Sequence, residues 1–165
     1  MARVIEIRTG LLPDDTETCA RLWVRAIEAR DGTVDAAPMA RRVRSALAGP
    51  LIRLAVATAP RAGFALTVPS GSVRDEAFLH FLAVDPGGTG GGVGTALMTD
   101  AIDHARAAGF AAMTLEVRED NTRAIALYER LGFAAYGVAR PHGIGDYAMQ
   151  PYRLALASPA TPFSV

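Results

Sequence analysis

The order of apolar and polar residues along the chain predicts a mixture of helices and strands. Residues 4–8 alternate between apolar and polar side chains, which is typical of a half-buried strand. Pro13 opens a stretch with acidic residues in its first turn and an apolar face at helical spacing. Trp23 lies on that face, and we expect it in the core rather than in a ligand site. A loop over residues 31–38 then precedes a second helix, predicted over residues 39–47.

Further strands follow, and one has the pattern of a strand buried on both faces. We expect them at residues 51–57, 63–68, 77–84, 113–117 and 152–156. Residues 77–84 read AFLHFLAV, an almost continuous apolar run that favours a central place in a sheet. Helices are predicted over residues 95–108 and 122–131, and Asn121 is a natural N-cap for the second.

These elements predict one α/β domain over residues 1–157, followed by a loose tail at residues 158–165. We expect a mixed, mostly antiparallel central sheet flanked by helices. Its buried strands and the helices after them form a right-handed crossover in this prediction. The length of 165 residues fits a single domain with a sizeable core.

Composition excludes several classes of function. The formal net charge is +0, which argues against a nucleic-acid binder. All 17 basic residues are arginine, so mechanisms that need a lysine, such as a Schiff base or a P-loop, are excluded. Cys19 is the only cysteine, which excludes an internal disulfide and a cysteine metal site. The three histidines lie too far apart in sequence for a helical zinc motif, so we expect no metal.

The sequence pattern indicates neither a signal peptide nor a membrane-spanning helix. The first residues, MARVIEIRTG, lack the apolar core of a signal peptide. No apolar run reaches the roughly 18 residues that a membrane-spanning helix needs. We therefore expect a cytoplasmic protein without a membrane partner.

A glycine-rich loop separates the strand predicted at residues 77–84 from the helix after it. Residues 84–98 read VDPGGTGGGVGTALM. Such a loop directs unpaired N–H groups and a helix dipole at one point, and without Cβ atoms a phosphate can approach closely. A structural turn is the alternative, although a turn requires fewer glycines. The dinucleotide fingerprint fits in no register, whereas the spacing x-x-x-G-x-G fits with Gly92 and Gly94 in the fixed places.

Two motifs together resemble the GNAT superfamily of acyl-CoA N-acyltransferases. The family's phosphate motif is usually Arg or Gln, two variable residues, Gly, one variable residue, then Gly or Ala; residues 89–94 match it except at Thr89. Residues 121–133 read NTRAIALYERLGF and fit the pattern N-x-x-A-x-x-L-Y-x-x-x-G-F at every fixed position. The resemblance is clearest over residues 77–133. It implies a GNAT-like sheet whose parallel middle strands splay apart.

The resemblance implies acetyl-CoA (coenzyme A) as the co-substrate. In the family, loop amides hold the pyrophosphate, and the pantetheine arm lies between the splayed strands, bonding to backbone much as an added strand would. The implied cofactor-binding residues are Leu82, Ala83, Val84, Thr89, Gly90, Gly91, Gly92, Val93, Gly94, Thr95, Asn121 and Tyr128. Because Thr89 is shorter than the usual Arg or Gln, we expect weaker cofactor affinity, carried mainly by the amides.

Tyr128 is the candidate general acid for the departing thiolate. Its ring lies on the apolar face of the helix predicted at residues 122–131, while its hydroxyl needs a partner. The family tyrosine at this position has the same role, in a direct attack without a covalent enzyme intermediate. A core tyrosine with a satisfied hydroxyl is the alternative.

His80 is the candidate general base, because it is the only ionisable residue within AFLHFLAV. A histidine that merely packs in the core is the alternative. Some family members carry a Glu or His base on this strand, acting through water. Glu76 and Glu116 are further candidates, which we expect to be solvated or structural, and His104 is expected on a solvated helix face.

The expected acceptor is a primary amine, on a small molecule or on a peptide N-terminus. Loops such as residues 140–147 commonly line the acceptor pocket in the family, which suggests His142, Asp146 and Tyr147 near the acceptor. The family also suggests a homodimer. A different class, a non-catalytic acyl-CoA sensor, is favoured by Thr89 and opposed by the retained Tyr128 and Asn121.

Overall fold

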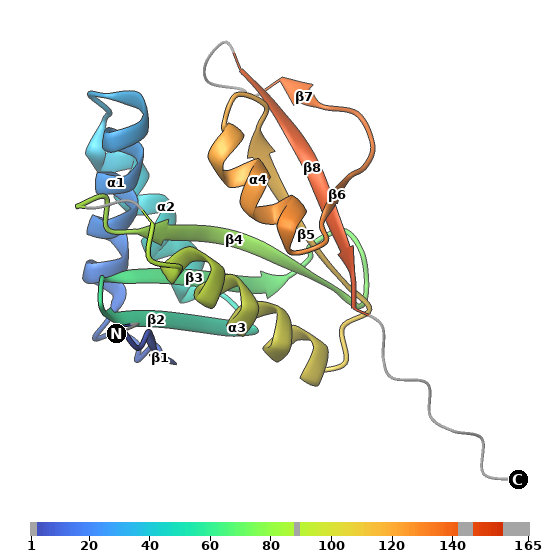
Figure 1. The fold of residues 1–165 in the computed structure, drawn as a ribbon, viewed down its shortest axis with the longest axis horizontal. Helices are drawn as coiled ribbons and strands as arrows, with labels where there is room; N and C mark the ends of the chain where they lie inside the picture. Colours follow the sequence, from blue (N-terminus) through green and yellow to red (C-terminus); the bar gives the residue numbers. More distant parts are fainter. Residues whose placement is uncertain (1–2, 88–89, 142–146, 157–165) are drawn as a thin grey trace, which may run out of the picture.

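One mixed sheet runs through the computed structural model, which describes residues 3–87, 90–141 and 147–156 (Figure 1). The strand order is β1-β2-β3-β4-β5-β8-β6, and β7 pairs with β8. The strands are β1 (Glu6–Thr9), β2 (Arg53–Ala59), β3 (Gly63–Pro69), β4 (Glu76–Val84), β5 (Ala112–Arg118), β6 (Ala134–Ala135), β7 (Arg140–Pro141) and β8 (Ala148–Ala155). The helices are α1 (Thr16–Asp31), α2 (Ala36–Ala48), α3 (Val93–Ala107) and α4 (Thr122–Arg130).

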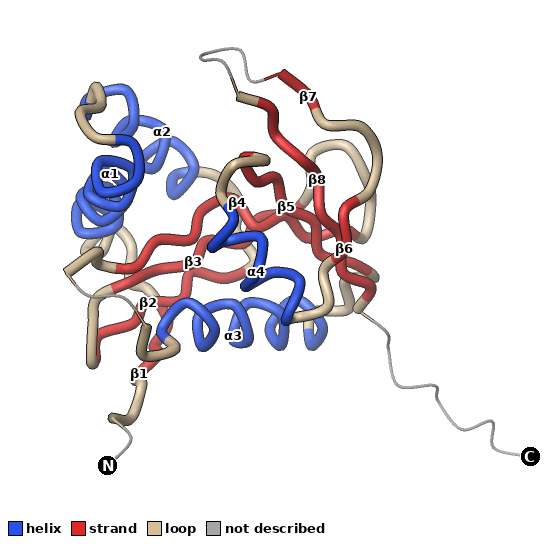
Figure 2. Tube along the Cα trace, turned by 45° about the horizontal axis from the view of Figure 1, so that its top comes forward, coloured by secondary structure: helices blue, strands red, loops and turns tan. Residues whose placement is uncertain are grey.

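Helices cover both faces of the sheet (Figure 2). Leu97 of α3 and Tyr128 of α4 are buried with Leu115 of β5 in one core cluster. Leu22 of α1 and Val43 of α2 are buried with strand residues in a second cluster. The α3–α4 layer and the α1–α2 layer therefore enclose the middle strands, which explains the continuous apolar run of β4.

The middle strands β4 and β5 run parallel and then separate. Their registered pairs are Glu76 with Ala112, Ala77 with Met113, and Phe78 with Thr114. Beyond these pairs, β4 continues to Val84 and β5 to Arg118, each still paired on its outer side with β3 or β8. Figure 1 shows β5 and β8 turning away from the direction of β2, β3 and β4. The mixed, mostly antiparallel sheet with splayed parallel middle strands is thus confirmed.

A β-bulge in β4 reverses the direction of its side chains. Leu66 of β3 pairs with Phe81 of β4. The next residue of β3, Thr67, pairs with Leu79, so His80 is the extra residue of the bulge. Leu79 lies in the core cluster beneath α3, whereas Phe81 lies in the cluster beneath α1 and α2.

The prediction for the first two helices is wrong at their ends. The loop expected over residues 31–38 is shorter, because α1 runs to Asp31 and α2 already begins at Ala36. Pro38 is the third residue of α2, where the missing N–H would have no intrahelical acceptor, so it does not interrupt the helix. Pro13 does not open α1 either, since the N-cap is Asp15.

The C-terminal part contains elements that the residue pattern did not predict. β8 begins at Ala148 rather than at residue 152, and β6 and β7 are two-residue strands that add to its edge. Strands this short have no readable period. Within the described residues, no helix combines the length and apolar character that crossing a bilayer requires.

Candidate active site

The separated edges of β4 and β5 form the centre of the candidate site. Leu82, Ala83 and Val84 lie beyond the last β4–β5 pair and pair with β3 on their other side. Their edge toward β5 therefore has no strand partner in the described structure. An extended ligand can bond to such an edge as an added strand would.

The N-terminus of α3 presents uncapped amides next to this edge. Gly92 is the N-cap, and no side chain caps the helix. Ala96 N donates to Gly92 O at 2.9 Å. The amides of Val93, Gly94 and Thr95 therefore have no acceptor within the helix. The first turn carries no acidic residue that would compete for its positive end, so an anionic group such as a pyrophosphate fits here.

The glycines before α3 are required by backbone conformation. Gly90, Gly91 and Gly92 have φ values of 81°, 95° and 78°, a region that L side chains rarely adopt. A Cβ at Gly90 or Gly91 would meet nothing within 4 Å, so crowding is not the reason for glycine. At Gly94 a Cβ would make an ordinary contact of 3.5 Å with Leu127 Cδ2. The departure at Thr89 lies outside the described residues.

Tyr128 is buried beside the opened strands on α4. The residue is 7% exposed, and its ring packs edge-on against Phe133 with centroids 5.9 Å apart. Burial raises the pKa of its hydroxyl to about 12. The hydroxyl therefore stays protonated throughout the neutral range, so Tyr128 can act as a proton donor there and not as a base.

His80 belongs to a row of aromatic rings on the α1–α2 face of the sheet. Its ring stacks on Phe81 at 4.4 Å with 12° between the planes, and Phe78 lies 5.7 Å away. Trp23 of α1 meets Phe81 edge-on at 4.7 Å. Desolvation, and then the charge of Arg42, lower the pKa of His80 below 6.5. The imidazole is thus neutral at pH 7 and able to accept a proton.

The two alternative bases differ in their surroundings. Glu76 forms an ion pair with Arg153 at 3.2 Å, at the end of β4 that is still paired with β5. Its carboxylate is thus engaged by an arginine, away from the opened part of β4. Glu116 lies on β5 beyond the last β4–β5 pair, and it is exposed between the buried Leu115 and Val117 of the α3 side. By strand alternation it faces the same side of the sheet as His80.

Asn121 and two other candidates have defined local roles. The Asn121 side chain accepts a hydrogen bond from Ala124 N at 3.2 Å and so caps α4. His104 is exposed and its Nδ1 lies 2.9 Å from Asp100 O, on the solvated side of α3. The ring of Tyr147 lies 4.1 Å beneath the guanidinium carbon of Arg118. His142 and Asp146 lie outside the described residues.

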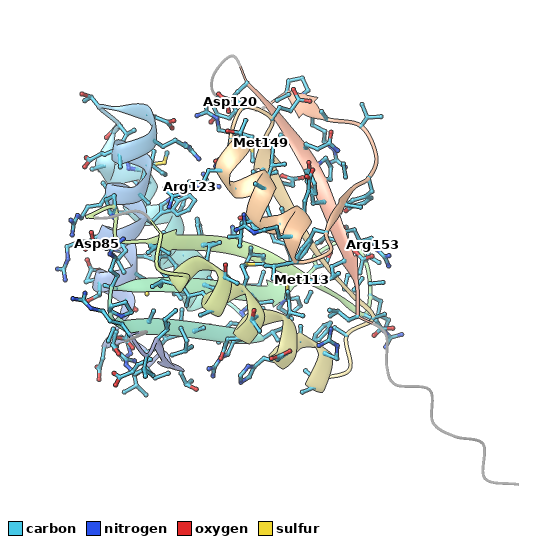
Figure 3. The ribbon with its side chains drawn as sticks, in the orientation of Figure 1. Asp85, Met113, Asp120, Arg123, Met149 and Arg153 are labelled. Atoms are coloured by element: carbon cyan, nitrogen blue, oxygen red, sulfur yellow. The ribbon has the colours of Figure 1, made fainter. Side chains whose placement is uncertain are left out.

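Sequence reasoning missed a charged cavity at the end of β5. Arg118 pairs with Asp120 at 2.6 Å and with Asp31, the last residue of α1, at 3.0 Å. Asp31 and Arg118 are 87 residues apart, so no spacing could reveal the pair. The cavity of about 230 Å³ is lined by Arg30, Asp31, Arg118, Asp120, Asn121, Thr122 and Arg123. Figure 3 shows Asp120 and Arg123 at the start of α4. In the described residues, no group of three His, Cys, Asp or Glu side chains gathers as a metal site.

Comparison with known families identifies the family of this chain. Residues 45–133 match the sequence profile of the Acetyltransferase (GNAT) family. This chain belongs to that family. It is 49% identical over 72 residues to the [ribosomal protein bS18]-alanine N-acetyltransferase of Escherichia coli K12. It is also 45% identical over 60 residues to the mycothiol acetyltransferase of Streptosporangium roseum. These matches cover 44% and 36% of the chain, and only 47% and 18% of the two relatives.

Solved GNAT structures share the fold over nearly the whole chain. The ribosomal-protein-S18-alanine N-acetyltransferase from Escherichia coli superposes with a TM-score of 0.76 at 27% identity, covering 98% of this chain and 100% of that one. A Salmonella typhimurium structure solved with its cofactor acetyl-CoA superposes with a TM-score of 0.71 at 21% identity, covering 98% and 99%. The second likeness supports the fold alone, since its identity is low.

Proposed function

We propose that the chain transfers an acetyl group from acetyl-CoA to a primary amine, by direct attack within a ternary complex. The observation that carries the proposal is the separation of β4 from β5 next to the uncapped first turn of α3. The open edge at residues 82–84 would hold the pantetheine arm, and the amides of Val93, Gly94 and Thr95 would hold the pyrophosphate. Acetyl-CoA supplies an activated thioester carbonyl when bound.

Tyr128 would provide the proton that the leaving sulfur needs. Its Oη holds this proton at every neutral pH, because burial raises its pKa to about 12. A free thiol has a pKa of about 8.5, so the transfer is uphill and depends on a short, desolvated path. Burial of Tyr128 in the same core cluster as Leu115 and Val117 of β5 supports this role.

His80 or Glu116 would remove a proton from the acceptor amine. An alkyl ammonium has a pKa of about 10.4, so a base must help at neutral pH. His80 is our first candidate, since its lowered pKa keeps the imidazole neutral. Glu116 is the alternative on the same face, exposed and next to the opened strands. A side chain reaching the amine through one water would suffice in either case.

The acceptor would be a small-molecule amine or a peptide N-terminus. The E. coli relative is named for an alanine of a ribosomal protein, and the S. roseum relative for mycothiol. Both names motivate substrates for a test, and neither assigns the acceptor of this chain. Peptides with N-terminal alanine, small-molecule amines and free amino acids form the first panel.

Thiol release from acetyl-CoA in the presence of this panel tests the proposal. We expect release with at least one class of amine, and acetylated amine by mass spectrometry in equal amount. Calorimetric binding of acetyl-CoA without release on any amine would instead indicate a non-catalytic acyl-CoA binder. Absence of binding would overturn the assignment of the α3 amides as a phosphate site.

A further inference from the structure

The glycine loop lacks a full positive charge for the phosphates it would bind. Residues 86–98 contain neither Lys nor Arg, and the basic residues of α3 lie in its last turn. Amides and the helix dipole contribute only partial charges. The pyrophosphate and 3′-phosphate of coenzyme A carry full negative charges. A cation at this end of the sheet therefore has to come from another element.

Arg61 lies in the turn between β2 and β3, beside the start of that loop. Its neighbour Ala62 accepts a hydrogen bond at 2.8 Å from the amide of Asp85, the first residue after β4. The next residue, Gly63, pairs with Val84 at the end of β4. Figure 3 shows Asp85 where β4 leads into the loop. The β2–β3 turn and the glycine loop thus share one end of the sheet.

Neighbouring residues place the turn that carries Arg61 beside α3. A Cβ at Gly63 would lie 3.0 Å from Leu97 Cδ1, so this position faces α3. Ala62 packs instead with the core cluster beneath α1 and α2. Arg61 lies at a bend two residues before Gly63, close to where α3 covers this end of the sheet.

One nitrogen of the Arg61 guanidinium lacks a hydrogen-bond partner. This atom, Nη1, is buried. A polar atom in that state is costly unless a ligand or water completes it. The nearby carboxylate of Asp85 is already engaged, with Arg25 at 3.1 and 3.2 Å and with the amide of Gly87 at 2.9 Å.

We propose that Arg61 binds a phosphate group of coenzyme A and supplies the charge that the glycine loop lacks. This inference rests on the proposed function and adds to it. Arg61 makes the site selective for phosphorylated pantetheine derivatives over phosphate-free ones. It also compensates for Thr89, which stands where the family motif usually has Arg or Gln.

Calorimetry on the whole chain tests the role of Arg61 with three ligands: coenzyme A, 3′-dephospho-coenzyme A and pantetheine. We expect Arg61→Gln to weaken coenzyme A binding about tenfold, in line with the loss of one charge-assisted hydrogen bond. Pantetheine affinity should stay within twofold of the unsubstituted chain. Arg74→Gln is the matched control, since Arg74 is an exposed arginine in the turn between β3 and β4, at the opposite end of the sheet.

The ligand series separates the phosphates and the two proposals. Equal weakening of coenzyme A and its dephospho form assigns Arg61 to the pyrophosphate, and weakening of coenzyme A alone assigns it to the 3′-phosphate. Coenzyme A affinity within twofold of the Arg74→Gln control overturns the inference, as does equal weakening of pantetheine. If the unsubstituted chain binds no coenzyme A, the proposed function fails as well. Thermal unfolding without ligand verifies that Arg61→Gln is folded.

Discussion

Tyr128 differs from an ordinary core residue by a hydroxyl whose pKa burial raises to about 12. We predict that Tyr128→Phe lowers kcat by about 10²-fold or more, because a positioned proton donor contributes on that scale. Acetyl-CoA affinity should change less than twofold, since the ring and its packing against Phe133 remain. Steady-state kinetics and calorimetry measure the two effects separately.

Tyr152 provides the control for this substitution. It is buried as well, and it lies in β8, on the far side of β5 from β4. Its hydroxyl lies 3.5 Å from Glu129 Oε1. Tyr152→Phe removes the same oxygen and should leave kcat within about twofold. Equal kcat values for Tyr128→Phe and the unsubstituted chain would show that Tyr128 has a structural role only.

The pH dependence of kcat/KM distinguishes His80 from Glu116. A base must be unprotonated to act, and the pKa of His80 is lowered from 6.5 by desolvation and Arg42. With His80 as the base, activity should therefore fall as pH drops below 6.5 and stay level above it until another group titrates. His80→Gln should remove this acidic limb and lower the plateau, while Glu116→Gln should keep both. The opposite result assigns the base to Glu116.

At the scale of elements, the glycines with positive φ before α3 make cofactor affinity depend on backbone conformation. Gly91 has a φ of 95°, and a Cβ at this position would meet no atom within 4 Å, so Gly91→Ala introduces backbone strain alone. An L residue in this backbone conformation costs about 1 kcal/mol. We predict that this cost lowers either the free energy of unfolding or, where the loop relaxes, the free energy of acetyl-CoA binding. Chemical denaturation and calorimetry together detect it.

Gly71 is the matched control for the loop substitution. It lies in the β3–β4 turn without a positive φ, and a Cβ there meets nothing within 4 Å. Gly71→Ala should leave stability and binding within about 0.5 kcal/mol. If Gly91→Ala behaves identically, the left-handed conformation of the loop contributes nothing to the site.

The elements also show what could be predicted from sequence. The apolar run of β4 and the motif around Tyr128 are local patterns, so the strand and the helix were both found. The bulge at His80 is set by its register with β3, which no local pattern records. The start of α2 was missed because Pro38 normally indicates a break, yet it is tolerated in a first turn. The open edge at residues 82–84 follows from family resemblance rather than from periodicity.

At the scale of the whole molecule, the opened strands require other contacts to hold the two halves of the sheet together. Beyond Phe78 and Thr114, β4 and β5 no longer pair. Arg118, at the end of β5, forms an ion pair across this region with Asp31 at the end of α1. The side chains of Arg118 and Asp31 are 16% and 26% exposed. Asp120 and the ring of Tyr147 complete its surroundings. The Arg118 network therefore links the N-terminal elements to β5 and β8 where the sheet itself does not.

We predict that Arg118→Gln destabilises the chain by about 1–2 kcal/mol, between the values for exposed and buried pairs. That loss corresponds to a fall in Tm of roughly 2–8 °C for a domain of this size. Arg106→Gln is the control, because Arg106 forms only an exposed pair with Asp103 within α3 and should shift Tm by less than a quarter as much.

The pKa of Asp31 is lowered by Arg30 first and then by Arg118. A lowered pKa stabilises the fold above the unfolded value of about 3.8 and loses this effect as pH falls. The difference in Tm between Arg118→Gln and the unsubstituted chain should therefore be full at pH 7 and shrink below pH 3.8, and a difference independent of pH would show that Arg118 acts through packing alone.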